Sequence, residues 1–317
     1  MKVGLCIPVC DPGEEFGRLT AAIEAQSARI DTVLIIDSSA SESPIEWPSA
    51  QVLRIDSSRY DHGGTRRMAA ELLAQADLLV FLTQDAVPAD PEAIASLLAG
   101  FSDPRVGAAY GRQLPRPNAG AIESHARLFN YPDTSGCKSA EDIPRLGLKA
   151  PFLSNSFAAY RRTALEEVGS FPGRCIVSED THVAARMLLA GWKIAYRAEA
   201  RVFHSHDFGL VEEFQRYFDI GVFHARAPRI RRRFGSAEGE GWRFLKSELQ
   251  YLLNESPLFI PSSLVRTGLK FIGYRLGLRE KCLPLNLKRR SSMQGAFWNS
   301  ESEGLPCSEN RPGFSQD

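Results

Sequence analysis

The chain has 317 residues, of which 44% are hydrophobic, so it can form one large domain or two small ones around a sizeable core. Its 38 basic and 38 acidic side chains cancel, which excludes a whole-molecule charge suited to nucleic acid, and we expect no nucleic-acid partner. The longest apolar runs, such as residues 78–82, fall far short of the roughly 20 residues that a membrane-crossing helix needs.

The cysteines and the first residues favour a cytoplasmic protein. Six cysteines are scattered without a Cys-x-x-Cys pair, which argues against a zinc cage and a disulfide framework and indicates a reducing compartment. The apolar run at residues 3–9 is too short for a signal-peptide core and lacks a small-residue cleavage site. We therefore expect a buried strand there and no export.

The first 110 residues alternate β-type apolar runs with helical patterns. The predicted strands are 3–9, 32–36, 52–55, 78–82 and 106–110, with helices around Phe16, Met68 and Ile94. This alternation predicts an α/β fold with a mostly parallel central sheet and helices on both faces. Ligands of such sheets bind beyond the carboxyl ends of the strands, so polar residues directly after each strand are candidates for a site.

The middle of the chain is less regular. Residues 112–149 show little periodicity, and a long segment of this kind inside a domain is usually functional or mobile. Further elements are predicted as strands at 155–160, 193–196 and 202–203 and as helices at 163–168 and 179–190.

The C-terminal part changes character. Apolar residues recur at helical spacing from residue 208, which predicts a helical extension over 208–290 after a catalytic domain of residues 1–207. Residues 291–317 are rich in Ser, Glu, Gly and Pro, and we expect a disordered tail there. Trp192 and Trp242 are predicted to be core residues, with sugar stacking as the alternative.

The strand at 78–82 runs directly into Thr83-Gln84-Asp85, which places a carboxylate at the mouth of the sheet. Mg²⁺ or Mn²⁺ suits such a carboxylate, because hard cations bind carboxylate and phosphate oxygens and neutralise a leaving diphosphate. The residues alone also allow Asp85 to be a turn or capping residue before the next helix.

Six short motifs follow one another along the first part of the chain. They are Ile7-Pro8-Val9, Ile35-Ile36-Asp37-Ser38-Ser39, Gly63-Gly64-Thr65-Arg66, Phe81-Leu82-Thr83-Gln84-Asp85-Ala86, Ser178-Glu179-Asp180 and Val202-Phe203-His204-Ser205-His206. In this order and spacing they resemble the motifs of family-two glycosyltransferases, over about the first 210 residues, and the rhamnosyltransferase branch is the most similar.

The resemblance implies a GT-A fold, an inverting single displacement from a nucleoside-diphosphate sugar, and a divalent ion bound partly by an Asp-x-Asp motif. Thr83 replaces the first Asp of that motif, which leaves Asp85 as its metal ligand. His204 matches a position that supplies a further ligand in related enzymes. His206 is two residues on and equally able to bind, and a local hydrogen bond is the alternative role for one of the two histidines.

The acidic pair Glu179-Asp180 opens a predicted helix, with Ser178 as its cap, so the helix dipole is expected to keep both acids ionised. An inverting transfer needs a carboxylate that accepts the proton of the acceptor hydroxyl. By its place in the family motif, Asp180 is that base, with Glu179 beside it. The alternative is that both acids only cap the helix.

The donor site is predicted from the same resemblance. Asp37 resembles the residue that reads the nucleobase, and two glycines with Arg66 suit ribose and phosphate. A tight turn with Arg66 on the surface is the alternative. The candidate donor-binding residues are Pro8, Val9, Asp11, Asp37, Asp61, His62, Gly63, Gly64, Arg66 and Gln84.

Two basic clusters suit either anionic lipid or plain solvent exposure, and we expect peripheral contact with the inner face of the plasma membrane. They are Arg226, Arg229, Arg231, Arg232 and Arg233, and then Lys288, Arg289 and Arg290.

These predictions together describe an enzyme that transfers L-rhamnose from dTDP-L-rhamnose to a hydroxyl of a glycan or lipid-linked acceptor in cell-surface polysaccharide biosynthesis. A UDP-hexose donor is one alternative. A non-catalytic nucleotide-binding scaffold subunit is another, suggested by Thr83. A sugar-phosphate nucleotidyltransferase is disfavoured, because residues 8–17 lack a Gly-rich basic phosphate loop.

Overall fold

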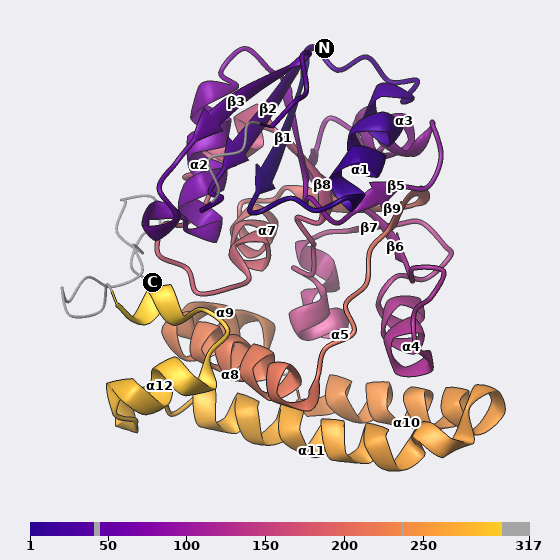
Figure 1. The fold of residues 1–317 in the computed structure, drawn as a ribbon, viewed down its shortest axis with the longest axis vertical. Helices are drawn as coiled ribbons and strands as arrows, with labels where there is room; N and C mark the ends of the chain where they lie inside the picture. Colours follow the sequence, from indigo (N-terminus) through magenta and orange to yellow (C-terminus); the bar gives the residue numbers. More distant parts are fainter. Residues whose placement is uncertain (41–44, 236–237, 300–317) are drawn as a thin grey trace.

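The computed structural model describes residues 1–40, 45–235 and 238–299, and a mixed nine-stranded sheet forms the centre of this described part (Figure 1). The strands lie in the order β3-β2-β1-β4-β8-β6-β9-β5, and β7 pairs with β9. Their bounds are β1 (Val3–Val9), β2 (Thr32–Asp37), β3 (Ala50–Arg54), β4 (Leu78–Leu82), β5 (Val87–Pro88), β6 (Val106–Leu114), β7 (Gly136–Lys138), β8 (Phe157–Arg161) and β9 (Lys193–Phe203).

Helices cover both faces of the sheet, as predicted. Their bounds are α1 (Glu15–Glu24), α2 (His62–Leu72), α3 (Ala93–Leu98), α4 (Ala121–Asn130), α5 (Ile143–Leu146), α6 (Arg162–Glu167), α7 (Glu179–Leu189), α8 (Leu210–Arg226), α9 (Pro228–Phe234), α10 (Glu238–Glu255), α11 (Ile260–Gly277) and α12 (Leu285–Ser291). The predicted α/β class is confirmed. The sheet is mixed, because β4 and β6 both pair antiparallel with β8, whereas β1–β4 and the β6–β9 pair are parallel.

Successive side chains of the central strands point to opposite faces of the sheet, and this alternation divides the core into two layers. In β4, Leu79 and Phe81 pack with α2 and α7 in one hydrophobic cluster, whereas Leu78, Val80 and Leu82 pack with α1 and α3 in the other. Successive side chains of a strand point to opposite faces, so a strand buried on both faces reads as a continuous apolar run. This burial explains why the short runs in the sequence located the strands well.

Two expectations for the middle of the chain are wrong. Residues 112–149 are not one irregular loop, because β6 continues to Leu114 and α4, β7 and α5 follow. The two predicted closing strands are one strand, β9, which pairs with β6 with register shifts between Val106 and Ala108 and between Gly111 and Arg112. Strand β7 and helix α5 were missed because they have only three and four residues, and α4 was missed because most of its residues are only partly buried, with His125 as its buried residue.

A layer of helices follows the sheet domain, as the pattern from residue 208 predicted, and α8 lies between α11 and the sheet (Figure 1). Helices α8 and α11 make close backbone contact through glycines. A Cβ on Gly277 would lie 2.1 Å from the carbonyl oxygen of Phe218, and one on Gly273 would lie 2.4 Å from that of Phe214. Residues without a side chain are therefore needed at this interface. The boundaries 1–207 and 208–290 remain predictions.

The end of the described chain is packed rather than disordered. Trp298 is fully buried, and Arg226 and Lys288 lie over its ring at 5.2 and 5.0 Å from the centroid. The prediction of disorder is therefore wrong for residues 291–299, because burial of the large Trp298 side chain orders this segment despite its polar composition. The rest of that predicted tail, residues 300–317, lies outside the described residues.

Two further features concern the surface. Trp242 is 74% exposed, so the prediction that it is a core residue is wrong, whereas Trp192 packs against the core. None of the helices in the described ranges combines the length and the hydropathy that a bilayer-crossing segment requires.

Candidate active site

Hydrogen bonds join the three loops that follow β1, β2 and β4. The Gln84 side chain accepts the backbone N–H of Cys10 at 2.7 Å and donates to the Cys10 carbonyl oxygen at 3.0 Å. The Ser39 hydroxyl accepts the backbone N–H of Asp11 at 2.7 Å. These loops therefore form one continuous edge at the carboxyl ends of the strands, where ligands of such sheets bind.

Asp37 ends β2 at this edge and is almost completely buried. Its carboxylate accepts the backbone N–H of Ser39 at 2.9 Å and forms an ion pair with Arg54 Nε at 3.2 Å. Pro8 and Val9 pair with the last two residues of β2, so they lie beside it. The structure therefore brings together the predicted group Pro8, Val9, Asp11, Asp37 and Gln84.

The predicted glycine segment opens α2. The Asp61 carboxylate accepts the backbone N–H of Gly64 at 2.7 Å and so caps the helix. A Cβ on Gly63 would lie 1.7 Å from the carbonyl oxygen of Pro172, so this glycine permits close packing of two backbones. Arg66 is 3% exposed, so the alternative of a tight turn with a surface arginine is wrong. Burial also lowers the pKa of His62.

Three side chains gather where β5 meets the end of β9. Val87 pairs with Phe203, so Asp85 precedes one strand and His204 follows the other at the same point of the sheet. The Nε2 atoms of His204 and His206 lie 3.3 and 3.6 Å from Asp85 Oδ2. One potential ligand atom from each of the three residues lies within 4.8 Å of the others. The sequence left open whether one histidine bonds only locally, and both in fact face Asp85.

The protonation states of this group suit a cation. Burial alone raises the pKa of Asp85, but the hydrogen bond and charge of His204 outweigh it and hold that pKa well below its usual range. Burial lowers the pKa of His206 to about 4, so its imidazole is neutral at pH 7. An ionised carboxylate and a neutral imidazole are competent metal ligands.

Gln113 of β6 orients His204. Its Oε1 lies 3.0 Å from His204 Nδ1 and also accepts from the Arg127 guanidinium. Because this amide oxygen is an acceptor, Nδ1 carries a proton. Once Nε2 gives up the proton that it donates to Asp85, its lone pair would face a cation bound beside Asp85. Gln113 was not predicted as a site residue, because it lies inside a strand and differs from its neighbours there in being a polar side chain that is only 2% exposed.

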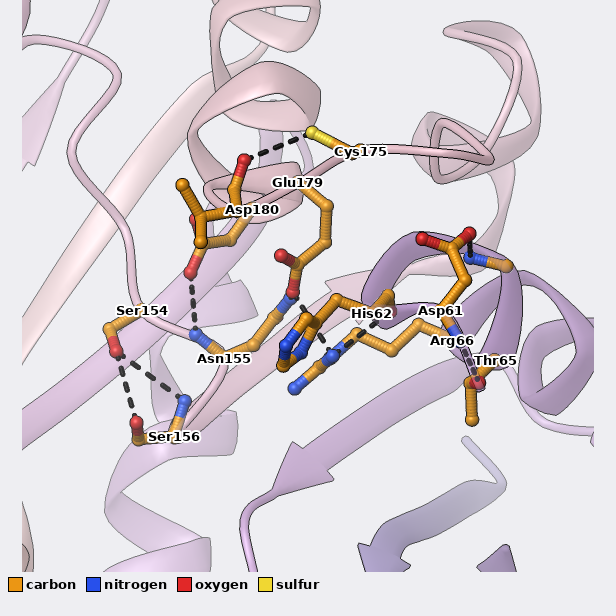
Figure 2. Close-up of polar contacts among 12 residues, drawn as sticks. Asp61, His62, Thr65, Arg66, Ser154, Asn155, Ser156, Cys175, Glu179 and Asp180 are labelled. Carbon is orange, nitrogen blue, oxygen red and sulfur yellow. Dashed lines mark hydrogen bonds and ion pairs between the residues drawn. The ribbon is translucent and has the colours of Figure 1, made fainter. Parts of the chain in front are cut away.

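The acidic pair lies at the start of α7 and has two different environments (Figure 2). Glu179 is buried, forms an ion pair with Arg66 at 3.1 Å and accepts the side-chain N–H of Asn155 at 2.9 Å. Asp180 is partly buried and accepts the backbone N–H groups of Asn155 at 3.1 Å and Thr181 at 2.6 Å. The two neighbours therefore have separate partners.

These environments separate the pKa values of the two acids. Burial, and next the adjacent Glu179 charge, raise the pKa of Asp180 to about 7. Although burial opposes it, the Arg66 charge lowers the pKa of Glu179. The expectation that both acids stay ionised is therefore wrong for Asp180, because desolvation and a like charge outweigh the helix dipole. Ser178 has a left-handed backbone (φ 63°) and makes no capping bond, so its predicted role is also wrong.

A chain of polar contacts links the two acidic centres. Asn155, which donates to Asp180, directly follows Ser154, and the Ser154 hydroxyl accepts from Gln113 Nε2 at 2.9 Å. Gln113 in turn contacts His204, which faces Asp85. Asp85 and Asp180 therefore lie along one connected edge of the sheet. Asn155 was not predicted as a site residue either, because an amide between two serines at the start of a predicted strand is a weak sequence signal.

Comparison with known proteins identifies the family. Residues 78–219 match the family model described as Glycosyl transferase family group 2. Over 304 residues the chain is 47% identical to the O-antigen chain rhamnosyltransferase RfbN of Salmonella typhimurium, which covers 95% of this chain and 97% of that protein. The chain belongs to the family-two glycosyltransferases.

Other comparisons agree. This glycosyltransferase is 46% identical over 282 residues to the O-antigen chain rhamnosyltransferase WbaN of Salmonella anatum, covering 88% of this chain and 90% of that one. Its fold is similar to that of the mannosyltransferase PcManGT from Pyrobaculum calidifontis, solved with GDP-Man and Mn²⁺. The TM-score is 0.53 at 17% identity, over 95% of this chain and 86% of that one. The predicted family, enzyme class and GT-A type fold are confirmed.

Proposed function

We propose that this glycosyltransferase moves L-rhamnose from dTDP-L-rhamnose to a hydroxyl of a growing glycan or lipid-linked acceptor, with inversion at the anomeric carbon. The sugar follows from the two relatives named O-antigen chain rhamnosyltransferase, each more than 45% identical. The observation that supports the chemistry is the occurrence on one sheet edge of an Asp/His group and a carboxylate whose pKa is raised to about 7.

The Asp/His group fits a divalent cation, and Asp85, His204 and His206 would hold it. Two imidazoles and one carboxylate suit Mn²⁺ better than Mg²⁺, because Mg²⁺ prefers oxygen ligands. When bound, the ion neutralises charge that develops on the leaving diphosphate. Gln113 holds His204 in the tautomer that leaves Nε2 free for the ion.

Asp180 acts as the general base in this proposal. Its carboxylate accepts the proton of the acceptor hydroxyl while that oxygen bonds to the anomeric carbon and the bond to the nucleoside diphosphate breaks. A pKa near 7 suits this task, since the carboxylate is then ionised in a large fraction of molecules and basic enough to accept a proton. Glu179 contributes its charge and is fixed by Arg66 and Asn155.

The edge formed by β1, β2 and β4 is the proposed donor site. Asp37 would read the base, while Pro8, Val9, Asp11 and Gln84 line the same edge. The segment from Asp61 to Gly64 keeps its predicted role beside ribose and diphosphate. Arg66 would not contact the donor, because its guanidinium forms an ion pair with Glu179. A cytoplasmic location accords with the five cysteines that are free thiols within the described ranges.

The proposal is tested by thermal stabilisation and turnover with a panel of sugar nucleotides, with and without Mn²⁺. We expect dTDP-L-rhamnose to raise the melting temperature most, in a Mn²⁺-dependent manner, and to give a rhamnosylated product by mass. Faster turnover of UDP-glucose, UDP-galactose or a UDP-N-acetylhexosamine than of dTDP-L-rhamnose would show that the proposed donor is wrong. Binding of nucleoside diphosphate without turnover of any sugar donor would indicate a scaffold.

A further inference from the structure

Helix α11 exposes its apolar side chains and buries its small ones. Leu264, Val265, Phe271 and Ile272 recur at positions that share one helix face, and each is at least 50% exposed. Leu258, just before the helix, is 92% exposed. A surface helix of a water-soluble domain normally has the reverse arrangement. We call these five residues the α11 apolar face.

The inward side of α11 explains this reversal. Ser263, Gly273 and Gly277 are its buried residues, and the two glycines contact the backbone of α8. Larger side chains do not fit where the two glycines meet α8. Leu264, Val265, Phe271 and Ile272 lie on the exposed side of α11, whereas Leu276 packs against the core. Figure 1 shows α11 on the side of α8 that faces away from the sheet. Contiguous exposed apolar surface of this kind marks an interaction site.

The charge around the face selects its partner. Residues 256–291 contain eight Lys or Arg residues and one acid, Glu280, although the whole chain is neutral. Glu280 is buried and forms ion pairs with Arg226 and Lys288, so an internal acid already neutralises these two cations. Arg279, Lys281, Arg289 and Arg290 are exposed. An apolar helix face that is followed by exposed cations, which form no ion pair with another described residue, suits an anionic lipid surface.

A second copy of the chain is a poorer partner. A two-fold contact would place the same surface of both copies together, so these cations would face their own equivalents. Acidic side chains that could neutralise them are absent from residues 256–291 apart from Glu280.

We propose that the α11 apolar face and the cations beside it dock this glycosyltransferase on an anionic membrane surface, with α11 lying in the plane of the lipid headgroups. The apolar side chains enter the boundary between headgroups and acyl chains, and Arg279, Lys281, Arg289 and Arg290 bind lipid phosphates. Fewer of the basic residues predicted from the sequence are therefore available to lipid, because Arg226 and Lys288 form ion pairs with Glu280. The apolar contact comes from α11, which lies outside the two predicted basic clusters.

The test is co-sedimentation of the full chain with vesicles of phosphatidylcholine alone or with 30% phosphatidylglycerol. We expect binding to the anionic vesicles, and at least a tenfold lower partition coefficient for the variant Leu264→Gln/Val265→Gln/Phe271→Gln/Ile272→Gln. The control Leu72→Gln/Leu189→Gln changes exposed leucines on α2 and α7 and should bind like the unaltered chain. Melting temperatures establish that each variant is folded.

A charge variant gives an independent result. Arg279→Gln/Arg289→Gln/Arg290→Gln should lower binding to anionic vesicles by about fivefold per cation removed. The matched control Arg29→Gln/Arg105→Gln/Arg145→Gln, whose side chains are 69–88% exposed elsewhere, should not. Equal pelleting of the unaltered chain and the quadruple variant would overturn the proposal. So would a solution dimer that the quadruple variant abolishes, because the face would then bind a second copy. Neither outcome depends on the donor or on turnover.

Discussion

Two adjacent carboxylates, Glu179 and Asp180, show how local partners divide chemical roles between like residues. Glu179 has a guanidinium and an amide donor, so it stays ionised. Asp180 has backbone donors and a charged neighbour, so its pKa is raised to about 7. Pairs of acids with separated pKa values are typical of sites where one acid exchanges protons.

The substitution Asp180→Asn tests the assigned base. An amide preserves the shape and still accepts one of the two backbone N–H groups with its single oxygen, but it does not accept the acceptor's proton. Turnover should fall by about 10²- to 10⁴-fold, while thermal stabilisation by the donor and Mn²⁺ is retained. The control Asp103→Asn alters an aspartate at the far end of the sheet and should leave turnover unchanged. Turnover within twofold of normal for Asp180→Asn would remove Asp180 from the mechanism.

The pH profile offers a second test at the same residue. Only ionised Asp180 accepts a proton, and its ionised fraction increases as pH rises through about 7. We therefore expect kcat/KM to decrease about tenfold per pH unit below this value and to level off above it. A profile measured at saturating Mn²⁺ that stays flat down to pH 5.5 would contradict this assignment.

Gln113 is predicted to act through His204. In Gln113→Leu the imidazole loses the acceptor that sets its tautomer, and we expect Mn²⁺ affinity to fall by about 10- to 100-fold. Gln113→Glu keeps an acceptor oxygen and should retain most of the affinity. Electron paramagnetic resonance titration of free Mn²⁺ measures both, with Gln51→Leu as an exposed control. Equal Mn²⁺ affinities for the leucine and glutamate variants would show that the contact between Gln113 and His204 does not contribute to metal binding.

At the scale of elements, the sequence predicted the fully buried strands well, and it predicted the short strands and the contacts between distant elements poorly. Buried strands such as β4 need only apolar side chains, which are visible in any window of the chain. By contrast, β5 has two residues and exists because β9 pairs with it, and this pairing is what brings Asp85 to His204. The order of motifs therefore predicted the residues of the site, but not the contacts through Gln113 and Asn155.

The close contact between α8 and α11 can be tested by adding a methyl group at one of its glycines. Gly277→Ala places a methyl group 2.1 Å from a backbone oxygen, so the helices must separate, and we expect a loss of about 1–3 kcal/mol in the free energy of unfolding. Gly268→Ala on the same helix has no atom within 4 Å and should instead stabilise by up to about 1 kcal/mol. Urea denaturation compares the pair. Equal effects would mean that helix propensity, not packing, governs this site.

At the scale of the whole molecule, the helical layer and the sheet domain are joined by one hydrophobic cluster. The cluster includes Tyr160 and Met187 on one side and Phe218, Val222 and Trp298 on the other. Composition alone predicted disorder where Trp298 lies, because an average over a polar segment hides a single large side chain. The described C-terminal residues therefore belong to the folded core of the enzyme.

Trp298 and Trp242 form a matched pair that tests this conclusion. Trp298 is fully buried beside Phe218 and below two cations, whereas Trp242 is 74% exposed. Truncation of a buried tryptophan removes its transfer free energy and leaves a cavity, so Trp298→Ala should cost about 3–5 kcal/mol of unfolding free energy. Trp242→Ala should change it by no more than about 0.5 kcal/mol. If both substitutions cost the same by urea denaturation, residues 291–299 do not contribute to the core, and the enzyme's folded unit ends before them.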